Sequence, residues 1–124
     1  MTATDELPEL PGIDKAEGLR RMMNKASLYE KVLRDFHARF CNETQTLQAC
    51  IDNGDLATAE RQAHSAKGLA GTIGAGQLQD LARDLELALH EGSPGVDEHF
   101  TRFNQELERI LAGIAQGFGI SDAR

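Results

Sequence analysis

A histidine, a lysine and two glycines lie at helical spacing near the middle of the chain. Residues 63–71 have the sequence AHSAKGLAG. At about 100° per residue, the positions i+3, i+4 and i+7 after His64 share its face of a helix. These positions hold Lys67, Gly68 and Gly71. An imidazole beside a cation, on a helical strip without side chains, predicts a reactive group that a second macromolecule approaches closely.

The two glycines are unfavourable for the helix itself. Each costs about 1 kcal/mol relative to alanine in a helix interior, so their presence indicates a need for space beside His64. By the same helical count, His64 lies about 140° from the centre of the apolar arc, and its imidazole is expected to face solvent. Close helix packing is the alternative use of Gly68 and Gly71, and it is disfavoured because their arc lies away from the apolar stripe. That stripe consists of Leu56, Ala59, Ala63, Ala66, Leu69, Ala70 and Ile73.

Three polar residues flank the same predicted surface, namely Arg61, Ser65 and Thr72. Their residue types alone do not distinguish an interface from an ordinary solvated face. They are candidates for contact with a partner, together with Gly68 and Gly71.

The other histidines and the two cysteines have simpler interpretations. His37, His90 and His99 are expected to be polar surface residues. His37 and Cys41 stand four residues apart, but two ligands do not make a zinc site, and no metal site is predicted. Cys41 and Cys50 fall in one predicted helix at a separation of about 13 Å, which is too far for a disulfide. They are expected to be reduced thiols.

Composition limits the classes of function. With 124 residues, of which 40% are hydrophobic and 27% charged, the chain is long enough for one domain with one core. A net charge of −7 argues against nucleic acid and against an anionic membrane surface, because both require clustered lysine and arginine. No apolar stretch approaches the 18 residues of a membrane span, and the first residues do not resemble a secretion signal. A cytoplasmic setting is expected.

The elements that position His64 are predicted to be helices, because no window alternates with period two. Residues 1–13 contain two prolines and are expected to form a loose lead-in. Helices are predicted from an N-cap at Asp14 to a break at Asn24, over 27–52, from an N-cap at Asp55 to about 73, between Gly76 and Gly92, and over 96–115. Gly74 is expected to allow a sharp reversal after the helix that carries His64.

Four long amphipathic helices joined by short turns pack most simply as an antiparallel four-helix bundle. The predicted fold is therefore all-α, with the short extra N-terminal helix across one end. The bundle is expected over 14–116, and residues 117–124 are expected to form a frayed C-terminal tail because of Gly117 and Gly119. Apolar side chains fill the predicted core, so no cofactor is expected, and a monomer suffices.

The central motif resembles that of histidine phosphotransfer (HPt) domains. The resemblance rests on AHSAKGLA at 63–70 followed by IGA at 73–75, and it extends to LPGID at 10–14, GLRR at 18–21 and the helix that contains Leu81-Ala82 and Leu85-Glu86. The resemblance spans about residues 10 to 92. Within the family, the chain is similar in particular to HPt modules attached to hybrid sensor kinases. Met23-Asn24 departs from the pattern, since many members have Gly-Gly or Gly-Asn there, and this departure affects the turn.

The resemblance implies a role for each residue of the motif. His64 would be the phosphoacceptor, Lys67 would offset the charge of the phosphoryl group, and Gly68 would give the partner clearance. The partners implied are receiver domains, which would bring the aspartate and a bound magnesium ion, and a hybrid sensor kinase in cis or in trans. The domain itself would be a phosphocarrier without kinase activity or independent turnover.

Two other classes of function are weighed against the carrier. A helical adaptor would bind a partner through the same face without phosphorylation of His64. A metal-dependent helical enzyme would need inward-facing carboxylates with Glu-x-x-His pairs, and the sequence contains no such pair. The adaptor is therefore the main alternative.

Overall fold

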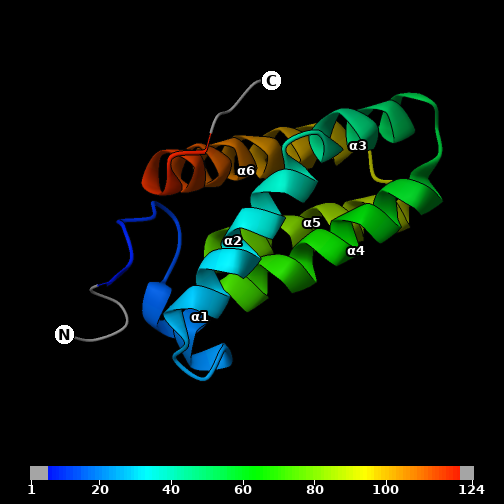
Figure 1. Cartoon of the computed structure of the whole chain (residues 1–124). Helices are drawn as coiled ribbons and strands as arrows, with labels where there is room; N and C mark the ends of the chain where they lie inside the picture. The colour runs from blue at the N-terminus through cyan, green and yellow to red at the C-terminus, as the bar shows by residue number, and fades with distance from the viewer. Residues whose placement is uncertain (1–5, 121–124) are drawn as a thin grey trace.

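The computed structural model describes residues 6–120, and this part of the chain is all-helical with no strand (Figure 1). The helices are α1 (Lys15–Arg21), α2 (Ala26–Phe40), α3 (Glu43–Asp52), α4 (Leu56–Ile73), α5 (Gly76–Glu91) and α6 (Val96–Phe118). The long helices pack together as a bundle, and the short α1 lies at one end (Figure 1). The predicted fold class is confirmed.

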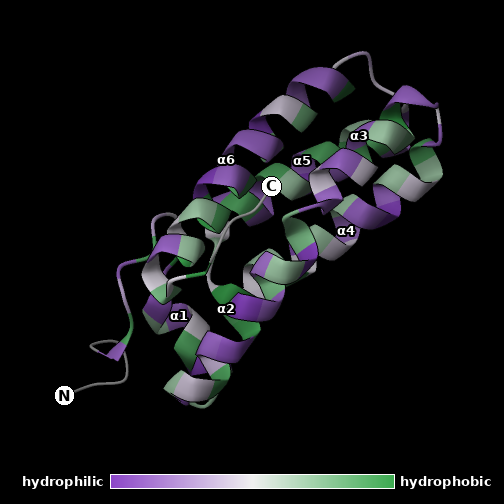
Figure 2. Ribbon diagram, turned by 45° about the horizontal axis from the view of Figure 1, so that its top comes forward, coloured by the Kyte–Doolittle hydropathy of each residue, from purple (hydrophilic) through white to green (hydrophobic). Residues whose placement is uncertain are grey.

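Each long helix is amphipathic. Figure 2 shows hydrophilic and hydrophobic residues alternating in bands along the helices, as expected where one face is buried and the other is solvated. The largest fully buried side chains come from α1, α2, α4, α5 and α6, and they form one continuous core. They are Leu19, Tyr29, Leu33, Phe40, Ile73, Leu78, Leu85, Phe103, Leu107, Ile110, Leu111 and Ile114.

The single helix predicted over 27–52 is wrong, because the chain bends between Phe40 and Glu43. The backbone N–H of Cys41 donates to the carbonyl of His37 and closes α2, and Asn42 then takes φ −116° and ψ −8°. After the bend, Leu47 of α3 is buried and α3 packs on α4. Burial of the α3 side chains against the core favours the bend. Neither glycine nor proline marks it in the sequence.

The predicted N-caps are confirmed. The carboxylate of Asp14 accepts a hydrogen bond from the backbone N–H of Glu17 at 3.1 Å, and that of Asp55 accepts one from the N–H of Thr58 at 3.3 Å. The side-chain and backbone hydrogen bonds of Thr58 hold the pKa of Asp55 below its ordinary value. These contacts fix where α1 and α4 begin.

The described part of the lead-in is packed, not loose. Leu7 and Leu10 are buried, and the rings of Pro8 and Pro11 lie where side chains at Gly117 and Gly113 of α6 would be. These contacts extend α6 to Phe118, three residues beyond the predicted end at 115. Gly117 is therefore helical, and Gly119 ends the helix with φ 65°. Residues 1–5 and 121–124 lie outside the described range.

The end of α4 is tied to the N-terminal helices. Gly74 ends α4 with φ 86°, which confirms the predicted reversal. The carbonyl of Gly74 accepts from the N–H of Asp14 at 2.8 Å, and the buried hydroxyl of Tyr29 donates to the carbonyl of Ile73 at 2.5 Å. Burial, with a smaller contribution from the charge of Asp14, raises the pKa of Tyr29. These two hydrogen bonds fix the position of the C-terminal end of α4 relative to Asp14 and α2.

The turn after α1 adopts the left-handed backbone conformation that glycine favours, although it contains no glycine. Met23 has φ 55° and Asn24 has φ 59°, both in the left-handed region. Asparagine tolerates this region, whereas methionine pays a steric cost at Cβ. The departure noted in the sequence therefore places local strain at the exposed Met23.

Met23→Gly is expected to raise the free energy of unfolding by up to about 1 kcal/mol, because glycine adopts the left-handed conformation without that cost. Urea unfolding followed by circular dichroism measures the change. Met23→Ala is the matched control, since it removes the exposed side chain but keeps Cβ. Equal stabilisation by both variants would show that the backbone conformation is not the cause.

Candidate functional site

The structure places His64 on the exposed side of α4, as predicted. The opposite side of the helix is buried and consists largely of alanine. It includes Ala63 and Ala66, which precede and follow His64 in the sequence. The His64 side chain is 66% exposed. The short alanine side chains let α4 and α5 pack closely, and this is the most extensive helix contact in the described fold. A rigid helix thus presents the imidazole to solvent.

Glu86 on α5 is hydrogen-bonded to the imidazole of His64 on the neighbouring helix α4. Its Oε2 lies 2.8 Å from Nδ1 of His64, and its Oε1 lies 2.8 Å from Nζ of Lys67. An ionised carboxylate can only accept, so Nδ1 of His64 carries the proton and donates it to Glu86. In the neutral ring this tautomer leaves the lone pair on Nε2. The free ring nitrogen is therefore the one that a partner can reach.

The charge state of Glu86 supports this arrangement. Its side chain is only 20% exposed, and burial alone would raise the pKa of its carboxyl. The hydrogen bonds from Lys67 and His64, together with the charges of these two groups, outweigh burial and hold the pKa of Glu86 below its ordinary value. Glu86 is therefore a carboxylate at neutral pH. Lys67 lies beside the histidine as predicted, but its ammonium is paired with Glu86.

The two glycines differ in their surroundings. A Cβ at Gly68 would meet no heavy atom of the described structure within 4 Å beyond its own helix, so Gly68 leaves an open strip beside His64. Gly71 is buried, and a Cβ there would overlap the amide of Gln79 on α5. For Gly71 the structure supports the alternative of close helix packing. Gly68 remains the glycine next to the exposed imidazole.

The flanking polar residues lie around the same face. Arg61, Ser65 and Glu60 line an open hollow with His64 and Glu86, with a volume of about 390 Å³. The guanidinium of Arg61 donates to the Thr58 hydroxyl at 3.1 Å. About two turns after His64, outside the hollow, the hydroxyl of Thr72 donates to the carbonyl of Gly68 at 3.0 Å. The hollow therefore brings together Arg61, Ser65 and His64.

The other histidines have different environments. His37 is only 5% exposed, so its prediction as a surface residue is wrong, and its Nε2 has no hydrogen-bond partner within the described range. It faces inward because it stands four residues after Leu33 and three before Phe40, on the buried side of α2. His90 is exposed, with Nδ1 3.3 Å from Oε2 of Glu60, and His99 is half-buried. No group of three metal-ligating side chains occurs among residues 6–120.

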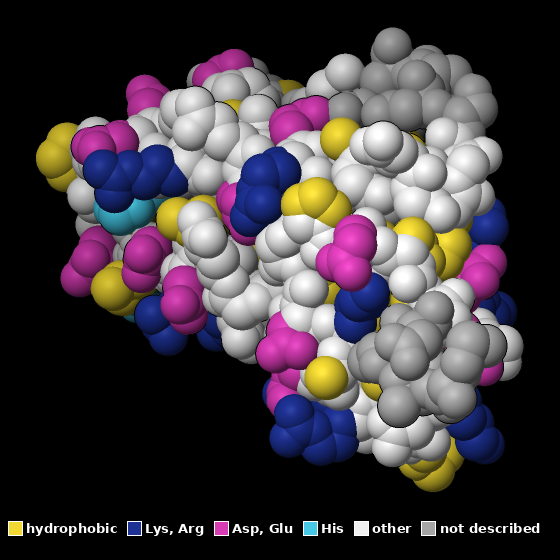
Figure 3. Space-filling model, turned by 90° about the vertical axis from the view of Figure 1, so that its left-hand side faces the viewer, with side chains coloured by type: hydrophobic (Ala, Val, Ile, Leu, Met, Phe, Trp, Pro, Cys, Tyr) yellow, Lys and Arg dark blue, Asp and Glu magenta, His cyan; other side chains and the backbone are white. Residues whose placement is uncertain are grey.

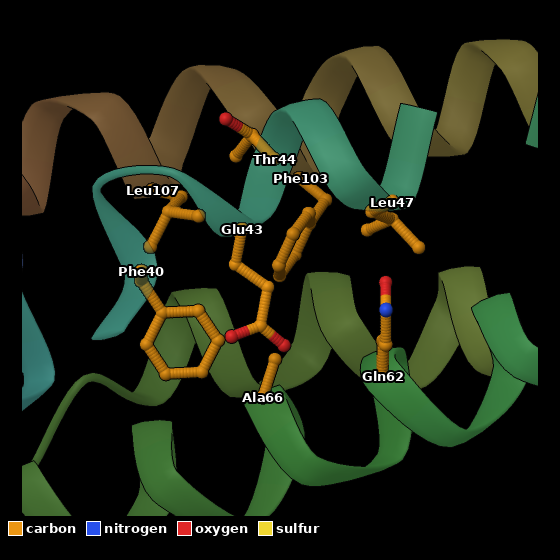
Figure 4. A pocket seen from close by; sticks show the side chains of 8 residues that line it. All are labelled: Phe40, Glu43, Thr44, Leu47, Gln62, Ala66, Phe103 and Leu107. Atoms are coloured by element: carbon orange, nitrogen blue, oxygen red, sulfur yellow. The ribbon is translucent and has the colours of Figure 1, made fainter. Parts of the chain in front are cut away.

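A small, partly open pocket lies between α2, α3, α4 and α6 (Figure 4), and His64 is not among the residues that line it. Its volume is about 10 Å³, which is room for about one water molecule. Figure 4 shows the carboxylate of Glu43 near Phe40 and Ala66, and the amide of Gln62 pointing towards Leu47. The amide oxygen of Gln62 is buried without a partner in the described structure. This pocket is too small to bind an organic ligand.

Charge is dispersed over the surface. On the face shown in Figure 3, acidic and basic side chains are intermixed and no basic patch forms. Many charged side chains of the described residues pair with a neighbour on the same helix, such as Lys31 with Asp35 on α2 and Arg102 with Glu98 on α6. None of the described helices is long and apolar enough to cross a membrane.

Fold and site define an all-helical bundle in which the exposed His64 is hydrogen-bonded to Glu86 and lies beside the open position of Gly68. A family model described as the Hpt domain matches residues 29–113, which is most of the chain and includes His64 and Glu86. The chain therefore belongs to the Hpt domain family. Its role is histidine phosphotransfer in a phosphorelay, and domains of this family interact with receiver domains. Comparison with curated proteins and with solved structures gives no match.

Glu86 is not among the site residues predicted from the sequence, although the sequence contains a signal that points to it. In an antiparallel helical hairpin, residues at equal distances from the turn face each other. His64 and Glu86 stand eleven residues before and after Ala75, between α4 and α5. Glu60 and His90 stand fifteen residues from the same position and also pair. Pairing the residues that stand at equal distances before and after the predicted turn identifies both pairs from the sequence.

Alanine substitution should separate the two glycines. Gly68→Ala is expected to raise the free energy of unfolding by about 1 kcal/mol, because alanine is the better helix former and the site is open. Gly71→Ala is expected to gain less or to destabilise, since the Gln79 side chain must move. Thermal unfolding of the two variants measures the contrast. Equal stabilisation of the two variants would mean that the Gln79 side chain moves aside without a loss of stability.

Proposed function

We propose that this domain is a phosphorelay intermediate that accepts a phosphoryl group on Nε2 of His64 from a receiver phospho-aspartate. It then passes the group to the aspartate of another receiver. One observation carries the proposal: Glu86 Oε2 lies 2.8 Å from Nδ1 of the exposed His64, so the ring is held and Nε2 is free. The open strip at Gly68 supports the same role, because a receiver must approach the ring closely.

The transfer needs little chemistry from the domain. The Nε2 lone pair attacks phosphorus, the bond from phosphorus to the aspartyl oxygen breaks, and its electron pair stays on the carboxylate. The ring becomes a cation that keeps its Nδ1 proton, so no proton has to move during the step. Alignment and charge stabilisation supply most of the rate in phosphoryl transfer. A rigid helix and a hydrogen-bonded ring provide the alignment.

Lys67 would offset charge on the phosphoryl oxygens. Its Nζ lies 2.8 Å from Glu86, on the same helical face as His64, and its side chain is partly exposed. A dianionic phosphoryl group on His64 would compete with Glu86 for this ammonium. We propose that the magnesium ion for the transfer is held by the receiver, and that this domain contributes no cofactor.

The docking surface would extend from the glycine strip towards α2. Leu69 follows Gly68 and lies in an apolar groove with Val32, Phe36 and Ile73. Apolar contact there would supply area for association, while Gly68 keeps the approach to His64 clear. We propose receiver domains as the partners, including one in a hybrid sensor kinase.

The first test uses phosphoramidate, a small phosphoryl donor. At neutral pH the wild type is expected to gain one acid-labile phosphoryl group by intact mass, and His64→Gln is expected to gain none. His90→Gln is the matched control, because His90 is also exposed and paired with a glutamate. Equal modification of His64→Gln would rule out His64 as the acceptor. An unmodified wild type would favour the adaptor.

A second test separates docking from chemistry. Gly68→Gln is expected to accept phosphoryl from phosphoramidate at the wild-type rate, because the small donor needs no docking surface, and to lose at least tenfold in the rate of transfer to a receiver. Gly76→Gln is the control, since Gly76 is equally open but lies at the start of α5. Rapid-quench assays with a receiver identified by screening measure both rates. Wild-type transfer by folded Gly68→Gln would contradict the role of Gly68.

A further inference from the structure

We infer that Glu86 keeps the Nδ1 proton on the phosphorylated ring of His64, and thereby keeps the nitrogen–phosphorus bond reactive towards the next acceptor. This inference rests on the proposed function. It assigns Glu86 as a positioning residue that acts through His64, without contact with the phosphoryl group. It concerns the second half of the relay, the release of the phosphoryl group.

The contact with Glu86 survives phosphorylation. The phosphoryl group binds Nε2, on the side of the ring away from Glu86, so Nδ1 still faces Oε2. Glu86 is 20% exposed on α5, where Leu85 before it and Leu89 three residues after it are core residues. Its second oxygen is held by Lys67 at 2.8 Å. Before the transfer the carboxylate is thus fixed by Lys67 and by its place on α5, and after the transfer its place on α5 keeps it opposite Nδ1 even where the phosphoryl group draws Lys67 away.

The Nδ1 proton decides how well the imidazole leaves. When the acceptor oxygen attacks phosphorus, the nitrogen–phosphorus bond breaks and its electron pair returns to Nε2. With Nδ1 protonated, the departing group is a neutral imidazole that retains its proton. Without that proton, the departing group is an imidazolate anion, which is a far poorer leaving group. A phosphorylated ring that has lost the proton is therefore slow to react.

A fixed negative charge favours the protonated, cationic ring. Among the described residues, Glu86 is the group that an observed hydrogen bond joins to Nδ1 of His64. The other charged groups around the hollow have partners of their own. Glu60 pairs with His90, Arg61 donates to the Thr58 hydroxyl, and Lys67 pairs with the far oxygen of Glu86. The net effect at Nδ1 is that of a carboxylate partly offset by one ammonium.

The test is Glu86→Gln, which removes the charge while the amide oxygen can still accept from Nδ1. Each protein is phosphorylated with phosphoramidate, and the phosphohistidine is titrated by ³¹P NMR. The midpoint of ring protonation is expected to fall by about one pH unit, because an opposite charge within hydrogen-bond distance is removed at a partly exposed site. Above both midpoints, loss of phosphoryl to water is expected to be about tenfold slower, in proportion to the protonated fraction.

Two further variants identify the cause. Glu60→Gln makes the same charge change in the same hollow but at the carboxylate that pairs with His90, and it is expected to shift the midpoint much less. Lys67→Gln removes the ammonium that offsets Glu86, so its midpoint is expected to move in the opposite direction, upward. Circular dichroism confirms that each variant is folded.

The outcomes separate this inference from the proposed function. If wild type and Glu86→Gln both carry phosphoryl on His64 with equal midpoints and equal rates of loss, the inference is wrong and the carrier role stands. An equal fall in the midpoint for Glu60→Gln and Glu86→Gln would also overturn it, because net charge would then suffice. If the wild type takes no phosphoryl on His64, the proposed function fails and the inference fails with it.

Discussion

Close packing of α4 against α5 is the constraint on which the site depends. Short side chains on the buried face of α4 let the two helices approach, and Gly71 extends this contact to Gln79. Gly74 reverses the chain with a positive φ, so that the helices run antiparallel from a fixed starting point. The distance and register of the two helices then determine which side chains meet. The small residues concerned are Ala59, Ala63, Ala66, Ala70 and Gly71.

Register alone accounts for the contacts along this seam. Pairs at equal distances from Ala75 face each other, and the direction of each pair alternates between the helices. At one level α4 supplies the histidine and α5 the glutamate, and one turn away α4 supplies the glutamate and α5 the histidine. Only the first of these histidines also has a lysine at its glutamate, since Lys67 reaches Glu86. The two histidines are therefore chemically distinct in spite of their similar exposure.

Local signals in the sequence predicted much of this arrangement. The caps at Asp14 and Asp55 and the reversal at Gly74 depend on one residue and its near neighbours, and all three are confirmed. The exposure of His64 followed from the period of the apolar residues. By contrast, burial of Leu47 against the core favours the bend between α2 and α3, and the local signal there is weak, because the Asn42 side chain makes no capping hydrogen bond and neither glycine nor proline occurs at the bend. The burial of His37 likewise follows from which face α2 presents.

Glu86 shows why pairwise contacts between helices escape this kind of prediction. A single-helix pattern gives the direction of His64 but not the group opposite, which depends on the turn and on the register of a second helix. The contact also resolves a physical conflict in the site. A phosphoacceptor must be exposed for a partner to reach it, yet an exposed side chain samples several rotamers and loses alignment. By holding Nδ1 from a neighbouring rigid helix, Glu86 fixes the ring without covering Nε2, so that exposure and alignment are achieved together.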